Sequence, residues 1–236
     1  MKDIYTITLY GFIVGVVGTG LGGLISLFIR NTDRTLSFLL GLTGGFMLFI
    51  VTFHLLPESF MLGGLPIAIG GIVLGILLVI TIEKGIGKMV DNPYMKAGLL
   101  LGISIAVHNL PEGLALGSSF LTDSNLGPVL ALAMLLHNIP EGLSIAIPLR
   151  ANRMGPSKVI LYTILAGAPT GVGAFIGAYM GMFSTLLIAL CLSFAGGTML
   201  YIICDEIIPG AKSLDGGKTS SIGVVLGFVV GIVLYF

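Results

Sequence analysis

The sequence predicts an all-α, polytopic membrane protein with eight transmembrane helices. Of its 236 residues, 56% are hydrophobic, and the mean hydropathy is +1.09, which is far above the range of soluble domains. Only 9% of the residues are charged, and most of them lie in short segments between long apolar runs. This pattern is that of a single membrane-embedded domain over residues 1–236, with the lipid bilayer as a partner and no role for nucleic acid.

A membrane-spanning helix needs about 20 apolar residues. The first run, 5–29, is too long for a signal-peptide core, so we expect it to remain as a helix. The next runs are 36–60, 65–83, 97–121 and 127–149. The uncharged run 159–204 is too long for one span, and a break at 181–184 divides it into helices at 158–181 and 185–208. The last helix, 219–236, is short but sufficient.

The basic residues predict the orientation of these helices. Ten of the 11 Lys and Arg residues fall near alternate connections, namely those between helices 1 and 2, 3 and 4, 5 and 6, and 7 and 8. Because positively charged connections stay in the cytoplasm, this set is expected to be cytoplasmic. Both termini are then outside the cell (inner) membrane.

One short motif, HNxPEG, occurs twice, at 108–113 and at 137–142, inside two apolar runs. Its His and Glu stand at i and i+4 and therefore share one helix face, and the Pro between them bends the helix. A hydrogen-bonded core histidine would explain one copy, but two copies at mid-membrane favour a nitrogen and oxygen site for a divalent metal, with Zn²⁺ a natural occupant. The Asn residues either add an oxygen ligand or orient the carboxylates. The predicted metal-site residues are His108, Asn109, Glu112, His137, Asn138 and Glu141.

The apolar runs contain five acidic residues and no Lys or Arg. Carboxylates are costly in lipid, so a proton or a metal cation is expected to neutralise them. His54 and Glu58 stand at i and i+4 toward the outer end of the second helix, and Asp205 and Glu206 stand toward the inner end of the seventh. These four residues are either interfacial anchors or an outer and an inner gate on one polar pathway.

A second repeat relates the early and late parts of the chain. The segment GGFMLFI at 44–50 matches GGTMLYI at 196–202, and HLLP at 54–57 matches EIIP at 206–209. The two matches have the same separation in the sequence, which is the separation of Gly44 from Gly196. We call this separation the repeat offset. Because helices 2 and 7 are five apart in order, they run in opposite directions, as do helices 4 and 5. These pairs predict an inverted 3+2+3 repeat, in which helices 1–3 are related to 6–8 around the central pair 4–5.

These motifs resemble the ZIP (Zrt/Irt-like protein) family of metal transporters, and most closely its compact prokaryotic members. The resemblance covers essentially the whole chain and is carried by the paired HNxPEG motifs, HLLPES at 54–59 and CDEIIPGA at 204–211. It implies uptake of Zn²⁺, or a related divalent ion, into the cytoplasm, with the metal as transported substrate and no cofactor. It also implies metal-site roles for His108, Asn109, Glu112, His137 and Glu141. A homodimer is the candidate assembly.

Two departures from the family pattern bear on the number of metals. Many members have an Asp where this chain has Asn138, and a Glu-Pro where it has Ala168-Pro169. Those carboxylates are associated with a second metal, so the sequence predicts one central metal here. The competing hypothesis is an intramembrane metal-dependent hydrolase, which would need an open metal position and an activated water. The absence of HExxH and the inverted symmetry favour a transporter rather than an enzyme.

Overall fold

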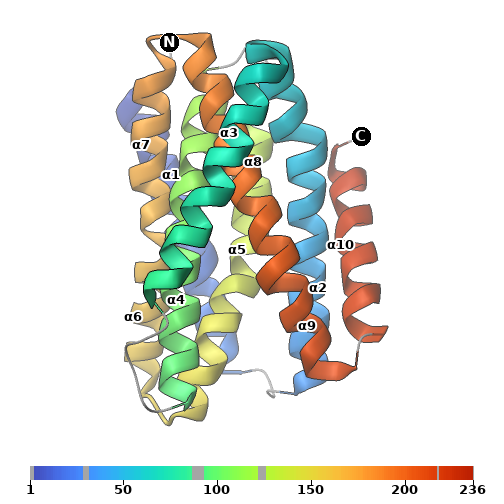
Figure 1. Ribbon diagram of the computed structural model, residues 1–236. Coiled ribbons are helices and arrows are strands. Elements are labelled where there is room, and N and C mark those ends of the chain that lie inside the picture. The colour runs from blue at the N-terminus through green and yellow to red at the C-terminus, as the bar shows by residue number, and fades with distance from the viewer. Residues whose placement is uncertain (1–2, 29–31, 87–92, 122–125, 217, 236) are drawn as a thin grey trace.

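The computed structural model describes residues 3–28, 32–86, 93–121, 126–216 and 218–235 (Figure 1). These residues form helices and turns only, which confirms the all-α prediction. The helices are α1 (Ile4–Ser26), α2 (Asp33–Ile50), the π-helix η1 (Val51–Leu55), α3 (Leu56–Ile86), α4 (Pro93–Ser119), α5 (Leu126–Ala151), α6 (Pro156–Gly167), α7 (Pro169–Gly181), α8 (Thr185–Ile202), the π-helix η2 (Ile203–Ile207), α9 (Ile208–Asp215) and α10 (Lys218–Tyr235).

Within the described residues, five helical segments are long and apolar enough to cross a membrane, judged by length and composition. They are 4–26, 33–81, 126–150, 156–181 and 185–215, and the apolar segment 218–233 is shorter. Large apolar side chains are exposed on the outside of the bundle, among them Phe28, Met61 and Val233. An exposed apolar surface of this extent requires a bilayer to cover it. The chain is therefore an integral, multi-pass membrane protein.

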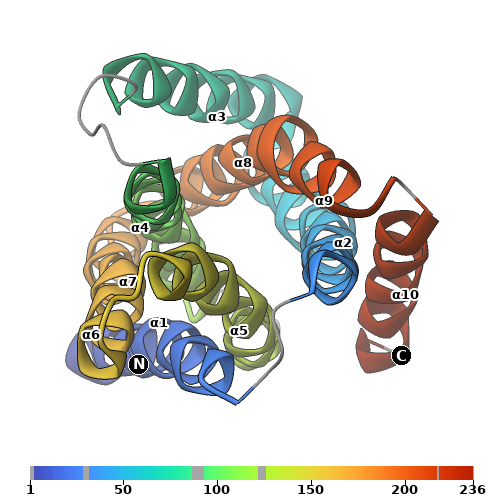
Figure 2. The ribbon, with the colours of Figure 1, turned by 90° about the horizontal axis from the view of Figure 1, so that it is seen from below.

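The helices form two groups that lie side by side (Figure 2). In the first group, α1 packs against α5, α6 and α7, and α4 packs against α7 and α5. In the second group, α3 packs along α8, and α2 packs along α10. A fully buried apolar cluster with contributions from α2, α4, α5 and α8, including Met47, Leu116, Met134 and Leu192, fills the seam between the groups.

Three helix boundaries differ from those expected, each for a local reason. The predicted break between helices 2 and 3 is a kink at Gly64, whose φ of 69° and ψ of 174° suit only glycine. The predicted helix 158–181 is divided at Ala168 by Pro169, which lacks a backbone N–H. The helical path predicted to end at 208 continues through α9 to Asp215, so Lys212 lies on a helix, and left-handed Gly216 (φ 63°) ends it.

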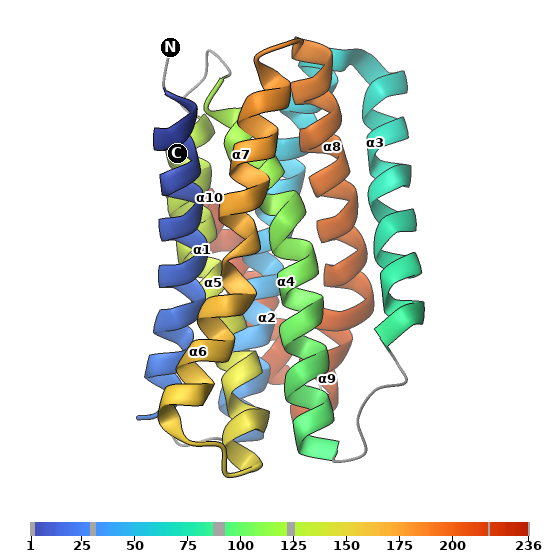
Figure 3. The same cartoon turned by 90° about the vertical axis from the view of Figure 1, so that its left-hand side faces the viewer.

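Two stretches of the chain match element by element at the repeat offset. That offset carries α2 onto α8 and η1 onto η2 with every boundary in register, and it carries the N-cap residue Thr32 onto the N-cap residue Ser184. In Figures 1 and 3, α2 rises from the end of the bundle opposite the N-terminus, whereas α8 descends toward that end. The two matched stretches therefore run in opposite directions.

Their packing contacts match as well. The Ser37 hydroxyl donates to the carbonyl of Ala211 over 2.7 Å, and the Ser59 hydroxyl donates to the carbonyl of Ala189 over 2.8 Å. The repeat offset carries Ser37 onto Ala189 and Ser59 onto Ala211. The same pair of repeat positions is thus joined twice by a hydrogen bond. The serine donor stands at the first position in one bond and at the second position in the other. We call these two hydrogen bonds the serine clamps.

Candidate metal site

The two HNxPEG motifs lie on α4 and α5, with Pro111 and Pro140 inside the helices. The final glycine of each motif allows a neighbouring helix to approach. A Cβ on Gly113 would lie 2.1 Å from the carbonyl oxygen of Thr170 on α7, and a Cβ on Gly142 would lie 2.0 Å from that of Thr19 on α1. Both distances are too short for a side chain. The glycines therefore fix the rotation of α4 and α5, and with it the direction of the motif side chains.

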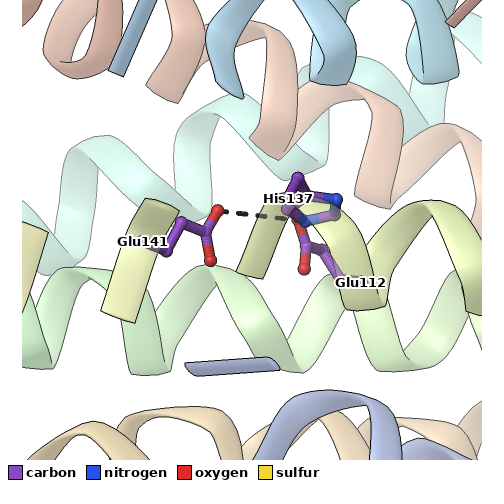
Figure 4. Close-up of side chains that lie close together, drawn as sticks. All are labelled: Glu112, His137 and Glu141. Carbon is purple, nitrogen blue, oxygen red and sulfur yellow. Dashed lines mark hydrogen bonds and ion pairs between the residues drawn. The ribbon is translucent and has the colours of Figure 1, made fainter. Parts of the chain in front are cut away.

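Three motif side chains converge in the interior, as Figure 4 shows. Glu112, His137 and Glu141 each offer a ligand atom, and these atoms lie within 4.8 Å of one another. The exposed fractions are 0%, 1% and 3%, so all three residues are shielded from solvent and lipid. The Nε2 atom of His137 lies 3.1 Å from Oε1 of Glu112 and 3.8 Å from Oε1 of Glu141. One imidazole nitrogen thus faces two carboxylates.

The other imidazole nitrogen is held by the backbone. Nδ1 of His137 lies 3.1 Å from the carbonyl oxygen of Ala133, which can only accept, so Nδ1 carries the hydrogen. In a neutral ring, Nε2 would then turn its lone pair toward two carboxylates. Such an arrangement is unfavourable unless a cation lies between them or Nε2 is protonated. A proton on one of the carboxyl groups would also relieve it, and so would a divalent metal bound by Nε2 and the carboxylates, so the donor set fits a metal ion.

The two asparagines of the motifs are fully buried as well. Asn109 donates from Nδ2 to the carbonyl of Ala166 on α6 over 2.8 Å. Its Oδ1, both side-chain polar atoms of Asn138 and the Thr170 hydroxyl are buried, with no hydrogen-bond partner among the described residues. Buried polar atoms are normally satisfied, so these are available to a ligand or to water. Thr170 was not predicted, and only its position after Pro169 distinguishes it in the sequence.

The remaining predicted residues lie elsewhere. His108 is on α4, but its side chain is outside the part of the chain that the structure describes. His54 on η1 is buried, and its ring contacts Phe49 edge-on with a centroid distance of 5.5 Å. Glu58 is half-buried on α3, Asp205 is exposed on η2, and Glu206 is half-buried there. Among the described residues, the cluster of metal-binding side chains does not include these four.

His54 nevertheless shares a cavity with a residue that contacts the cluster. It lines a cavity of about 60 Å³ together with Phe46, Phe49 and Ile50 of α2, with Gly231 of α10, and with Val129, Leu132 and Ala133 of α5. Ala133 is the residue whose carbonyl holds His137. The cavity thus reaches the same turn of α5 that orients the cluster histidine.

Comparisons with known proteins point to one family. Residues 92–235 match the family described as ZIP Zinc transporter. The chain is 31% identical to the zinc transporter ZupT of Akkermansia muciniphila over 91% of each chain, and 32% identical to that of Chlorobium phaeovibrioides over 98% of this chain and 97% of the relative. It is 33% identical to that of Corynebacterium glutamicum over 91% of this chain and 92% of the relative. With α4 and α5 inside the matched region and relatives aligned over most of their length, the chain belongs to the ZIP zinc transporter family.

Proposed function

We propose that this chain carries Zn²⁺, or a related divalent cation, across the cell membrane into the cytoplasm. The observation that carries the proposal is the buried cluster of Glu112, His137 and Glu141, in which one imidazole nitrogen faces two carboxylates. His108, Asn109 and Asn138 complete the proposed site by their positions in the motifs. The metal is substrate rather than cofactor. The named relatives are transporters, and no feature of the site favours the hydrolase alternative, so we propose that the chain is not an enzyme.

The proposed site holds one metal. The two carboxylates balance the charge of one divalent ion, because Asn138 and Ala168 are uncharged. A second ion about 4 Å away would be strongly repelled in a buried site. Metal counting by anomalous scattering and by titration tests this, and two bridged metals at full occupancy would contradict it. Asn138→Asp combined with Ala168→Glu is expected to create a second central site.

The proposed topology is one transmembrane domain of eight spans over residues 1–236, arranged as an inverted 3+2+3 repeat. It is supported by the constant offset between α2–η1 and α8–η2, and by the serine clamps. The packing of the helices supports it too. The repeat relates the contact of α1 with α5 to that of α7 with α4, and it relates the contact of α2 with α10 to that of α8 with α3.

The proposed pathway runs from the end of the bundle that bears the termini to the opposite end (Figure 1). Four basic residues mark that opposite end, in the first turns of α2, α6 and α10 and on α9; they are Arg34, Lys158, Lys218 and Lys212. By the positive-inside rule the basic end is cytoplasmic, and both termini are outside. His54 and Glu58 then form the outer gate, and Asp205 and Glu206 form the inner gate.

The function is tested with purified protein in sealed liposomes. Saturable uptake of Zn²⁺ into liposomes is expected for the unaltered chain, and loss of that uptake is expected for Glu112→Gln. Asp33→Asn, which makes the same carboxylate-to-amide change at an exposed position, is the matched control. Equal uptake by protein-free liposomes and by the unaltered chain would refute transport.

A further inference from the structure

Two π-helices interrupt the bundle at matched positions. In η1 the N–H of Leu56 donates to the carbonyl of Val51, and in η2 the N–H of Ile208 donates to that of Ile203. Each bond joins positions i and i+5 instead of the i and i+4 of an α-helix, so each segment contains one extra residue. Because the repeat offset carries η1 onto η2 and their flanking helices onto each other, the same irregularity is built twice.

The sequence explains both irregularities. Pro57 follows Leu56, and Pro209 follows Ile208. Proline has no N–H to donate, and in a regular α-helix its ring would press on the carbonyl four residues earlier. Widening the preceding turn relieves that contact, and such insertions are frequent at functional sites.

Each π-helix lies between two fixed points. Ser37 and Ser59 form clamps on either side of η1, and the acceptors of those clamps, Ala211 and Ala189, lie on either side of η2. The flanking helices are therefore anchored to each other. A rearrangement in either stretch can be confined to the widened turn, because that turn contains one residue more than a regular α-helical turn.

The fourth residue of each π-helix is a proposed gate residue, His54 in η1 and Glu206 in η2. His54 is buried and lines the cavity that reaches Ala133 at the seam between the two helix groups. When an extra residue moves along a helix, each side chain that it passes turns by about 100°, since an α-helix has about 3.6 residues per turn. A turn of that size would move a side chain from the seam to another face of the helix.

We propose that η1 and η2 are a matched pair of local switches, which rotate His54 and Glu206 into and out of the seam while the serine clamps hold the flanking helices. This proposal rests on the proposed function. It makes Pro57 and Pro209 positioning residues for the two gates. They act on the rate at which the ion passes and not on its binding at the central cluster.

The test removes the extra residue from each switch. Deleting Thr52 or Cys204 converts the turn to a regular α-helix, while the flanking helices keep their register with the clamps. Each deletion variant is expected to insert into liposomes and to bind Zn²⁺ with a Kd within about threefold of the unaltered chain. Its maximal uptake rate is expected to fall at least tenfold. The matched controls are Thr52→Ala and Cys204→Ala, which keep the residue count and are expected to transport normally.

Maximal uptake at the control rate in both deletion variants would overturn the switch and leave the transport function standing. Absence of saturable uptake by the unaltered chain would overturn both. If the deletion variants do not insert into liposomes, the proposal is tested with Pro57→Ala and Pro209→Ala. Each of these substitutions restores a backbone N–H and favours a regular helix. They are expected to lower the maximal rate several-fold with unchanged Kd, and an unchanged rate in both would overturn the proposal.

Discussion

Replacing Glu112 by Gln should separate metal binding from folding at the central cluster. The substitution keeps the shape of the side chain but removes one of the two carboxylates that lie within 4.8 Å of the His137 nitrogen. At about 4 Å and an effective dielectric constant of about 20, one pair of unit charges is worth about 4 kcal/mol, which is a lower bound for a carboxylate and a divalent ion. Since about 1.4 kcal/mol corresponds to a tenfold change, zinc affinity should fall by at least about 1000-fold.

The metal-free protein should respond in the opposite direction. With Gln at position 112, the side-chain amide can donate to Nε2 of a neutral His137, whose Nδ1–H is already held by Ala133. One buried carboxylate is also removed. The metal-free variant should therefore melt at the same temperature as the unaltered chain or higher, whereas the rise in melting temperature on adding zinc should disappear.

The assay is isothermal titration with Zn²⁺, paired with thermal unfolding in detergent with and without metal. Asp33→Asn again serves as the matched control. An unchanged Kd in Glu112→Gln would refute a ligand role for this carboxylate. A lower melting temperature of the metal-free variant would refute the charge argument, because it would show that Glu112 stabilises the empty fold.

Three further predictions follow from the fold and the site. Zinc affinity should weaken as pH falls from 7.5 to 5, because protons compete with metal for the two carboxylates and for Nε2 of the histidine, and a flat titration series would contradict these ligands. Gly113→Ala should lower the free energy of unfolding by roughly 1–3 kcal/mol through overpacking. Gly70→Ala, whose Cβ would meet nothing within 4 Å, should leave it unchanged or raise it by up to about 1 kcal/mol, because alanine favours a helix over glycine. Equal losses in both variants would contradict the close approach of α4 and α7. In a protein without its natural cysteines, Phe183→Cys and Ser213→Cys should react with a membrane-impermeant maleimide from opposite sides, the former from outside, and labelling from the same side would refute the topology.

Much of the fold could be predicted from the sequence because membrane spans follow from composition and length. The helices cover the predicted apolar runs, and the break after Gly181 is as expected, whereas the predicted break near Gly64 is a kink within α3. The extension of α9 through Lys212 was missed because a single charged residue does not end a helix, whereas a left-handed glycine such as Gly216 does. The π-helices η1 and η2 were not predicted, because an extra residue in a helical turn leaves no trace in hydropathy.

The site was predictable in outline only. The i, i+4 spacing placed His137 and Glu141 on one face of α5, and the repeat suggested that Glu112 would meet them. The pairing of His137 with the glutamates of both motifs depends on how α4 and α5 are rotated about their axes. That rotation is set by contacts of Gly113 and Gly142 with other helices, and these contacts lie far apart in the sequence.

The group that fixes the tautomer of His137 is a peptide carbonyl, that of Ala133. An alanine scan of α5 would not detect it, since every residue placed at position 133 brings the same carbonyl. Its contribution becomes measurable when the amide between residues 133 and 134 is replaced by an ester through semisynthesis, because an ester carbonyl is a weaker acceptor. The ester should hold the imidazole of His137 less firmly in its orientation and should therefore lower the zinc affinity, although no side chain has been altered.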